Sequence, residues 1–364
     1  MKSNIDDKKP APQEMVDRLT WPQPQHLPLG RLHRMAWRAV GEVGGEPWLL
    51  LHGGPGSSCQ PGMLRPFDLL RQRVIAPDQR GCGASRPKGR TTGNHTAALV
   101  ADMEALREHL GLARWSVLAG SWGTVVALAY TLAHPQRVQR LVLRGAFALS
   151  KREVGGLLLP SSRVRQSLGW CPLWPCTAGT VLPVALQKLT QMIQNGTSPV
   201  ASLRAARGWG LLEAATVARS QRRSLLHAAA MSPRLAASIR PEWASMRRAQ
   251  KRATARLKRP GKTRSDRRAI AKFRIQAHYL RHRGFMRAAQ LDRGVLQAAR
   301  FNIPVDWVHG QFDAVCPPVN SRRWAALGRA AGGKVVLVEP RSGHLGHEPD
   351  MLNALRNSVR RTLP

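Results

Sequence analysis

Ser121 follows Ala119 and Gly120 and stands two residues before Gly123, where a buried apolar segment gives way to a helical one, in the run Ala119-Gly120-Ser121-Trp122-Gly123. A sharp strand-to-helix turn tolerates only small flanking residues, because it forces the serine into a strained conformation that lifts its hydroxyl clear of the sheet. Ala119 replaces the first glycine of the usual pattern, so a small-residue helix N-cap is the alternative interpretation. The run therefore predicts a serine nucleophile whose partners come from elsewhere in the chain.

A carboxylate and an imidazole occur late in the chain, each just past a predicted strand. Asp313 follows one apolar run and His344 follows the next. A serine needs a neighbouring imidazole to accept its proton, and the imidazole needs a carboxylate to fix its tautomer and stabilise its charged form. Ser121, Asp313 and His344 are therefore the predicted catalytic groups. His347 is the nearest alternative, and we favour His344 because the Gly343-His344 pair lies closer to the strand end.

A glycine-rich segment, 52–56, follows an early apolar run and offers backbone amides. Attack on a carbonyl group needs N–H donors for the negative oxygen that develops in the transition state. We expect one donor to be the amide of Gly54. The second should be the amide of Trp122, directly after the predicted nucleophile.

The segments that carry these residues alternate between two patterns. Short apolar runs near 48–51, 74–76, 115–119, 138–143, 305–308 and 334–338 predict strands. Helical spacing predicts helices over 96–110, 123–134 and 349–363, with a further helix between the last two strands. This order predicts an α/β fold with a parallel sheet and helices on both faces.

The alternation stops between residues 147 and 300, where the sequence is rich in Ala, Leu and Arg and has helical character. The simplest interpretation is one α/β core in two pieces with a helical insertion between them. We place the core at residues 1–147 and 301–364 and the insertion at residues 148–300.

Composition and charge restrict the class of protein. The chain has 364 residues, of which 43% are hydrophobic and 21% are charged, which excludes a disulfide-stapled miniprotein and a wholly disordered chain. It has 57 Lys and Arg against 21 Asp and Glu, a formal charge of +36, so nucleic acid and anionic membrane surfaces are candidate partners. The basic segment 247–268 is the expected contact, as an amphipathic helix. A solvated face, or the coding bias of a GC-rich genome, is the simpler alternative.

The cysteines and the apolar segments indicate in which cellular compartment the protein is expected. Five irregularly spaced cysteines do not form a disulfide framework, and we expect a reducing cytoplasm. Cys171 and Cys176 lack a second pair or a nearby histidine, so no metal site is predicted. The first 20 residues lack the pattern of a signal peptide, and three prolines argue against a membrane-spanning helix over 166–187.

Five short runs together resemble those of the proline iminopeptidases, α/β-hydrolases that remove an N-terminal proline from peptides. The resemblance is strong over about residues 45–150 and 300–345. It implies an α/β-hydrolase fold with an inserted helical cap, a serine aminopeptidase activity, a peptide substrate with a free N-terminus, and no metal or organic cofactor. The runs are His52–Gly56, Asp78–Ser85, Gly120–Gly123, Leu143–Gly145 and Asp313–Pro317.

The resemblance also implies substrate-binding residues in the cap, where acidic side chains hold the substrate's amino group and aromatic ones hold the proline ring. Glu213 matches one of the acids, whereas Gln276 stands where a second glutamate is expected. Phe147 keeps an expected ring, Leu280 replaces another, and Arg144 belongs to a matching run. The missing carboxylate predicts weakened or altered selectivity for proline.

Two other functions stay open at this stage. An esterase or amidase on the same three catalytic groups is favoured by Gln276 and Leu280, which depart from the amine-binding pattern. A basic protein that binds RNA or membrane, on an inactive hydrolase scaffold, is favoured by residues 247–268. Dependence of turnover on a free amine separates the first from an aminopeptidase, and deletion of 247–268 tests the second.

Overall fold

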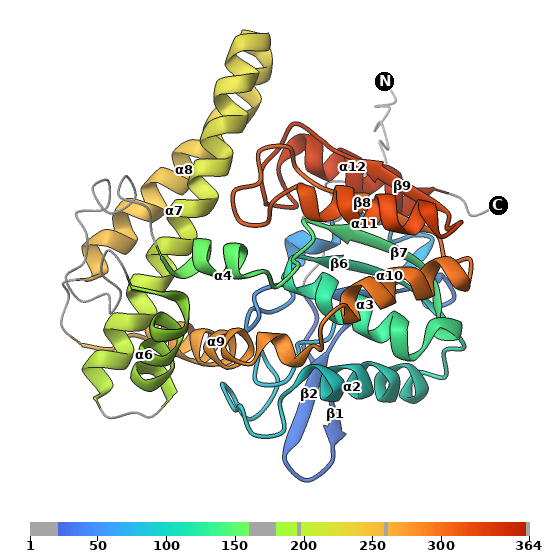
Figure 1. The fold of residues 1–364 in the computed structure, drawn as a ribbon, viewed down its shortest axis with the longest axis horizontal. Coiled ribbons are helices and arrows are strands. Elements are labelled where there is room, and N and C mark those ends of the chain that lie inside the picture. The colour runs from blue at the N-terminus through green and yellow to red at the C-terminus, as the bar shows by residue number, and fades with distance from the viewer. Residues whose placement is uncertain (1–20, 160–179, 195–197, 258–260, 362–364) are drawn as a thin grey trace, which may run out of the picture.

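A seven-stranded sheet forms the centre of the molecule (Figure 1). The computed structural model describes residues 21–159, 180–194, 198–257 and 261–361. The strands lie in the order β3-β5-β4-β6-β7-β8-β9, and all neighbours pair parallel except β3, which is antiparallel at one edge. Their bounds are Ala39–Gly41 (β3), Glu46–Leu51 (β4), Gln72–Ile75 (β5), Trp115–Gly120 (β6), Val138–Arg144 (β7), Val305–Val308 (β8) and Val335–Val338 (β9).

Helices cover both faces of this sheet, which confirms the predicted fold class. Successive side chains of a strand point to opposite faces, so Leu49 and Leu51 of β4 join one apolar cluster and Trp48 and Leu50 join the other. The first cluster takes in α2, α3, α10 and α11, and the second takes in α12. Their bounds are Thr96–His109 (α2), Trp122–Ala133 (α3), Gln290–Arg300 (α10), Val319–Ala330 (α11) and Pro349–Arg360 (α12), with short 3-10 turns at Pro61–Leu64, Pro135–Arg137 and Arg283–Phe285.

An antiparallel hairpin precedes the sheet and was not predicted. It consists of β1 (Gln25–Leu29) and β2 (His33–Trp37). Three adjacent residues of β2, 35–37, are all buried, so the strand lacks the polar and apolar alternation by which a half-buried strand is recognised.

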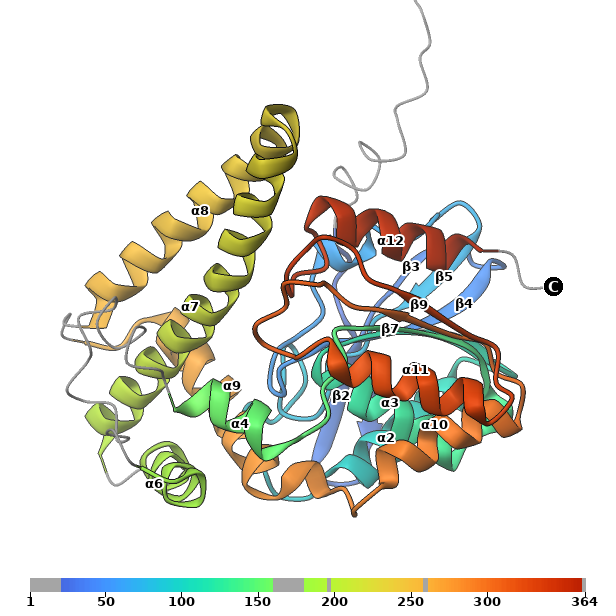
Figure 2. The same ribbon diagram turned by 45° about the horizontal axis from the view of Figure 1, so that its top comes forward.

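Five described α-helices lie between β7 and α10, and the described part of residues 147–300 contains no strand. α7 and α8 form a long antiparallel pair that projects past the sheet, and α6 and α9 pack near its base (Figures 1 and 2). The bounds are Lys151–Leu158 (α4), Leu182–Gln194 (α6), Pro199–Met231 (α7), Pro233–Leu257 (α8) and Arg264–Arg281 (α9). The described part of 247–268 thus includes the end of a helix, as the sequence predicted.

The expected boundary between the insertion and the core, at residue 301, separates α10 from α11, although both helices lie against the sheet. Leu291 and Val295 of α10 are buried in the cluster that contains α3 and the sheet, and α10 contacts α3 and α11. We therefore propose that the core resumes at α10, before residue 301.

The predictions for the cysteine pair and for the uncharged stretch concern residues that the structure describes only in part or not at all. Cys171 and Cys176 lie outside the described residues, as does most of the uncharged stretch 166–187. Within the described ranges, no helix combines the length and the apolar character that a membrane crossing requires.

A buried ion pair holds the projecting helices to α9. Asp266, at the start of α9, accepts hydrogen bonds from Arg207 Nε at 3.0 Å and Nη2 at 2.8 Å, and it caps α9 together with Thr263. Arg207 also donates to the carbonyl oxygens of Arg256 at 2.8 Å and Gly261 at 3.0 Å. One guanidinium thereby joins α7, the end of α8 and the first turn of α9.

We expect Asp266→Asn to lower the free energy of unfolding by about 2 to 4 kcal/mol at pH 7, because it leaves the buried Arg207 without its counter-charge. The hydrogen bonds from Arg207 hold the pKa of Asp266 well below its ordinary value, even though burial raises it. A depressed pKa stabilises the fold above the ordinary value of 3.8, and this contribution is lost as the pH falls below it. Chemical denaturation at several pH values measures the difference between wild type and variant.

The matched control is Glu108→Gln, which removes an exposed carboxylate from α2. It should change the free energy of unfolding by less than about 0.5 kcal/mol. Equal effects of the two variants, or an Asp266→Asn effect that grows at acidic pH, would contradict the structural role of the ion pair.

Candidate active site

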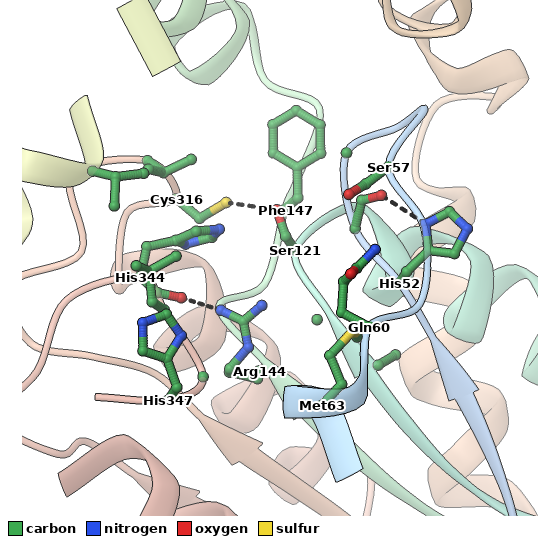
Figure 3. Close-up of a pocket in the computed structure, with 18 of the residues that line it drawn as sticks. His52, Ser57, Gln60, Met63, Ser121, Arg144, Phe147, Cys316, His344 and His347 are labelled. Carbon is green, nitrogen blue, oxygen red and sulfur yellow. Dashed lines mark hydrogen bonds between the residues drawn. The ribbon is translucent and has the colours of Figure 1, made fainter. Parts of the chain in front are cut away.

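The carboxyl ends of four parallel strands bring the predicted residues together at one edge of the sheet. Gly54 follows β4, Ser121 follows β6, Asp313 follows β8 and His344 follows β9. Ser121, His344 and Gly54 line a cavity of about 580 Å³, within the size range of small-molecule sites. Figure 3 shows Ser121 at its centre, with His344 and Cys316 on one side and His52 on the other.

Ser121 occupies the sharp turn between β6 and α3. Its backbone has φ 55° and ψ −124°, a left-handed conformation that non-glycine residues rarely adopt. A Cβ at Gly120 would lie 2.4 Å from Arg144 Nη2, and one at Gly123 would lie 2.6 Å from the carbonyl oxygen of Leu51. The small neighbours are therefore required by close packing, and the turn matches the one that the sequence predicted.

The Ser121 hydroxyl lies 3.9 Å from the Sγ of Cys316 and makes no hydrogen bond to His344. A hydrogen bond between a catalytic serine and its base is commonly loose before substrate binds and tightens in the complex. Cys316 is only 1% exposed, and burial, with the charge of Asp313, raises the pKa of its thiol well above the ordinary value. The thiol therefore stays protonated near neutral pH and is a poor nucleophile.

Asp313 and His344 form a buried pair. His344 Nδ1 lies 2.7 Å from Asp313 Oδ2, and Asp313 is 6% exposed. The other carboxylate oxygen accepts the backbone N–H groups of Val315 at 2.8 Å and Cys316 at 2.9 Å. With Nδ1 engaged by the carboxylate, Nε2 is the ring nitrogen left for proton transfer.

The environment keeps Asp313 ionised. Burial alone would raise its pKa, but the charge of His344 and hydrogen bonds from His309 and His344 outweigh this and hold the pKa well below its ordinary value. His309 in turn is fixed by Ser321, with Nδ1 and Oγ 2.6 Å apart. Sequence reasoning did not single out His309, because only the fold places it beside the acid.

His347 has a different partner. Its Nε2 pairs with Glu242 of α8, and its side chain is 48% exposed, although it also lines the cavity. Because Asp313 pairs with His344, the geometry favours His344 as the base.

Glu348, at the start of α12, holds the loop that carries His344. One carboxylate oxygen accepts the N–H of Gly343 at 2.7 Å and the other accepts the N–H of Leu345 at 3.0 Å. These two residues flank His344. Burial, with a smaller contribution from the charge of Glu242, raises the pKa of Glu348 above its ordinary value, although the two backbone hydrogen bonds act against this.

We expect Glu348→Gln to lower kcat about 10- to 100-fold, because an amide opposes one of the two N–H donors with its own NH2 and displaces His344. The free energy of unfolding should change by less than about 1 kcal/mol, since relief of a buried charge offsets the lost hydrogen bond. Wild-type activity should also decline on acidification from a pH above 4.5, the ordinary value for Glu, because the raised pKa protonates Glu348 there. Steady-state kinetics from pH 4.5 to 8, with denaturation curves, measure both.

Glu339→Gln is the control, because Glu339 lies at the start of the same loop but its carboxylate pairs with the exposed Arg322 and not with the N–H groups that flank His344. It should leave kcat within about twofold of wild type. A positioning role for Glu348 is contradicted if its variant loses stability but keeps kcat, or if the normalised pH profiles of variant and wild type coincide.

The proposed oxyanion donors lie on either side of Ser121. Trp122 is the first residue of α3, so its backbone N–H has no acceptor within the helix. Gly54 lines the cavity in the loop after β4. Gln79 braces both sides, because it accepts a hydrogen bond from Trp122 Nε1 at 3.1 Å and donates one to the carbonyl oxygen of His52 at 2.9 Å.

Four of the five predicted substrate-binding residues line the same cavity. They are Arg144, Phe147, Glu213 and Gln276. Arg144 donates a hydrogen bond to the carbonyl oxygen of His344, and burial lowers its pKa. Leu280 is placed differently: it is 2% exposed within the apolar core and does not line the cavity. It lies one turn after Gln276 on the same face of α9, at a point where that face packs against the core and no longer lines the cavity.

Glu213 has two partners on α9. Its Oε1 accepts a hydrogen bond from Gln276 Nε2 at 2.8 Å, and its Oε2 pairs with the ammonium of Lys272. Glu213 and Gln276 were both predicted to bind the amino group of the substrate, whereas Lys272 was not predicted. The one indication of Lys272 in the sequence is its position one helical turn before Gln276. Lys and Arg are so abundant in this chain that the position alone does not distinguish it.

Comparisons with known proteins agree with this architecture. The family model for the alpha/beta hydrolase fold matches residues 46–350. A proline iminopeptidase of Xylella fastidiosa is 32% identical over 327 residues, covering 89% of this chain and 91% of its own. A proline iminopeptidase of Neisseria meningitidis serogroup B is 32% identical over 348 residues, covering 94% and 97%. A solved alpha/beta hydrolase from a Medee basin deep-sea metagenome library has a TM-score of 0.54 at 13% identity, covering 91% and 96%, and supports the fold alone.

Proposed function

The chain belongs to the proline iminopeptidases of the alpha/beta hydrolase fold family, and we propose that it is a serine aminopeptidase that prefers N-terminal proline. The observation that carries this proposal is the Asp313–His344 pair, 2.7 Å apart, beside the cavity that Ser121 lines. The relatives supply the substrate class, which is a peptide with a free N-terminus.

In the first half of the reaction Ser121 Oγ attacks the carbonyl carbon of the N-terminal residue while His344 Nε2 takes the serine proton. Asp313 stabilises the imidazolium that forms. The amides of Gly54 and Trp122 stabilise the oxyanion of the tetrahedral intermediate. His344 then protonates the leaving amine, the C–N bond breaks, and the shortened peptide departs from an acyl-enzyme.

In the second half a water molecule attacks the acyl-enzyme while His344 removes its proton. Collapse of the second tetrahedral intermediate returns the proton to Ser121 and releases the free amino acid. Side chains and backbone amides supply every group that these steps need, so the proposed reaction requires no metal or organic cofactor.

Recognition of the substrate's amino end falls to the residues of the cavity wall. Glu213 provides a carboxylate for the ammonium group, because burial of an unpaired charge is costly. Gln276 provides an amide, and Phe147 an aromatic surface for the proline ring. Loss of one carboxylate relative to the family pattern should weaken binding of the amine about 10- to 100-fold.

Initial-rate hydrolysis of four substrates tests the proposal, with Ser121→Ala protein as the blank. They are prolyl-p-nitroanilide, its N-acetylated form, alanyl-p-nitroanilide and p-nitrophenyl acetate. The aminopeptidase should cleave the free prolyl amide at least about tenfold faster than the other two amides. Equal rates on free and N-acetylated prolyl amides would contradict it.

A relaxed esterase or amidase is the second candidate, and one observation favours it. Both oxygens of Glu213 already have donors within the protein, in Gln276 and Lys272. Serine-dependent cleavage of p-nitrophenyl acetate, without any preference for a free amine among the amides, would support this function.

The exposed surface of α8 favours an additional, weak anionic partner. Its basic face consists of the exposed residues Arg247, Arg248, Lys251, Arg252 and Arg256. Ala253 and Leu257 of this segment pack against the apolar core, and its exposed apolar residues, Ala249 and Ala255, are small, so the face offers no bulky apolar side chains for insertion into lipid. We therefore propose nucleic acid rather than a membrane as the partner.

Fluorescence anisotropy with a labelled 20-nucleotide RNA tests this partner between 50 and 200 mM salt. Binding should weaken steeply with salt, and replacement of the five basic-face residues by Gln should reduce the salt slope by about 0.7 per lost phosphate contact. Binding to anionic vesicles but not RNA, or no binding at 50 mM salt, would contradict the proposal.

A further inference from the structure

Three side chains from two helices meet in the wall of the catalytic cavity. Glu213 lies on α7, and Lys272 and Gln276 lie one turn apart on α9. All three line the cavity that Ser121 also lines. Each oxygen of the carboxylate has one donor, since Gln276 Nε2 lies 2.8 Å from Oε1 and the Lys272 ammonium pairs with Oε2.

The orientation of the Gln276 amide follows from chemistry. A carboxylate only accepts hydrogen bonds, so the NH2 group must face Glu213 and the carbonyl oxygen must face away. Gln276 is fully buried, and among the described residues its Oε1 has no hydrogen-bond partner. A buried orphan acceptor is costly, and an N–H group of a ligand would satisfy it. A residue of the cavity wall therefore carries a buried, unpartnered acceptor beside a carboxylate that is already in use.

Lys272 is the mobile member of the group. Its side chain is 30% exposed, against 22% for Glu213, and Gln276 is fully buried, so Lys272 is the member best placed to move its polar group into water. Its Nζ also lies 4.7 Å from the ring centroid of Phe273, which adds a cation–π contact to the ion pair. A ligand ammonium that reached Glu213 would share one carboxylate with this second cation and be repelled by it.

We propose that Lys272 determines substrate specificity by competing with the substrate's ammonium group for Glu213. This inference rests on the proposed aminopeptidase function and concerns the same cavity. Lys272 lowers the affinity for a free N-terminus until it is displaced, whereupon the substrate nitrogen bonds to Glu213 and to Gln276 Oε1. Its effect is on binding and therefore on KM, because Lys272 does not contact the reacting atoms.

A binding experiment isolates the competition from catalysis. In Ser121→Ala protein, isothermal titration calorimetry measures the Kd of L-prolinamide and of N-acetyl-L-prolinamide with and without Lys272→Met. The variant should bind L-prolinamide about 10- to 100-fold more tightly and the N-acetylated compound equally well. Arg268→Met is the matched control, since it removes an exposed cation from the same helix outside the cavity.

Further variants guard against a folding defect in Lys272→Met. Lys272→Gln also removes the charge and should tighten prolinamide binding, whereas Lys272→Arg keeps the charge and should leave it weak. In protein with Ser121 intact, Lys272→Met should lower KM for prolyl-p-nitroanilide with kcat within about threefold of wild type. KM for p-nitrophenyl acetate, which has no amine, should not change.

Unchanged or weaker binding of L-prolinamide by the charge-removing variants overturns the inference, as does no detectable binding in any variant. An equal gain for the N-acetylated compound, or an equal gain in Arg268→Met, also overturns it. These outcomes are separate from failure of the proposed function, which is judged by whether wild-type protein cleaves the free prolyl amide in a Ser121-dependent reaction.

Discussion

Ser121→Ala should lower kcat for prolyl-p-nitroanilide about 10⁵-fold or more, which removes nearly all detectable turnover. The proposed reaction passes through a covalent acyl-enzyme on this oxygen, and alanine offers no nucleophile in its place. The free energy of unfolding should stay within about 1 kcal/mol of wild type, because only one hydroxyl is lost. Single-turnover assays with purified protein, alongside chemical denaturation, measure both quantities.

Cys316→Ala provides the control, because its sulfur lies 3.9 Å from the serine hydroxyl and is the nearest other nucleophile. The raised pKa of this buried thiol keeps it protonated, so its loss should change kcat by less than about tenfold. If Cys316→Ala were inactive and Ser121→Ala active, the nucleophile would be the thiol and the proposed mechanism would be wrong.

His344→Ala should lower kcat about as much as Ser121→Ala, roughly 10⁵-fold, because the two groups act as a unit. Without the imidazole, no base lies at the position that Asp313 stabilises. The loss should appear in kcat and leave KM nearly unchanged, since His344 acts on the proton and not on substrate affinity. Steady-state kinetics over a range of prolyl-p-nitroanilide concentrations separate the two parameters.

His347→Ala is the matched control for His344→Ala, because it removes the same type of side chain three residues away in the same cavity. His347 pairs with Glu242 and not with Asp313, so its loss should change kcat by less than about threefold. Comparable losses in the two variants, or a larger loss in His347→Ala, would mean that the base has been assigned to the wrong histidine.

Much of the fold was predictable because the sheet is buried on both faces. Parallel strands covered by helices appear in sequence as short, continuous apolar runs, and the runs at 48–51, 115–119 and 305–308 are strands in the structure. The N-terminal hairpin lacked such a signal, since β2 buries three adjacent residues and exposes its other face only partly. The boundary near α10 was obscured because a helix that covers the sheet and a helix of the insertion have similar compositions.

The catalytic geometry was predictable to the extent that strand order determines it. Ser121, Asp313 and His344 each follow a parallel strand, and the carboxyl ends of such strands meet at one edge. The supporting contacts were harder to predict. Lys272 reaches Glu213 from another helix, so this contact depends on tertiary packing. Glu348 bonds to the N–H groups of residues 343 and 345, which are local contacts, but they depend on the conformation of an irregular loop.

The position along α9 explains the one predicted residue that lies elsewhere. Lys272, Gln276 and Leu280 are four residues apart and share one face of the helix, but only Lys272 and Gln276 line the cavity, and Leu280 packs into the core. A motif match along the chain does not state where along a helix the cavity ends. Only the packing of α9 against its neighbours decides it.

Covalent labelling with a proline analogue tests the central claim most directly, because it reports the nucleophile and the amine preference together. Wild-type protein is incubated with the diphenyl phosphonate analogue of proline, or with its N-acetylated form, and examined by intact-protein and peptide mass spectrometry. The account predicts a single adduct on Ser121 that forms faster with the free amine and is absent from His344→Ala. An adduct on another residue, or faster labelling by the N-acetylated form, would contradict it.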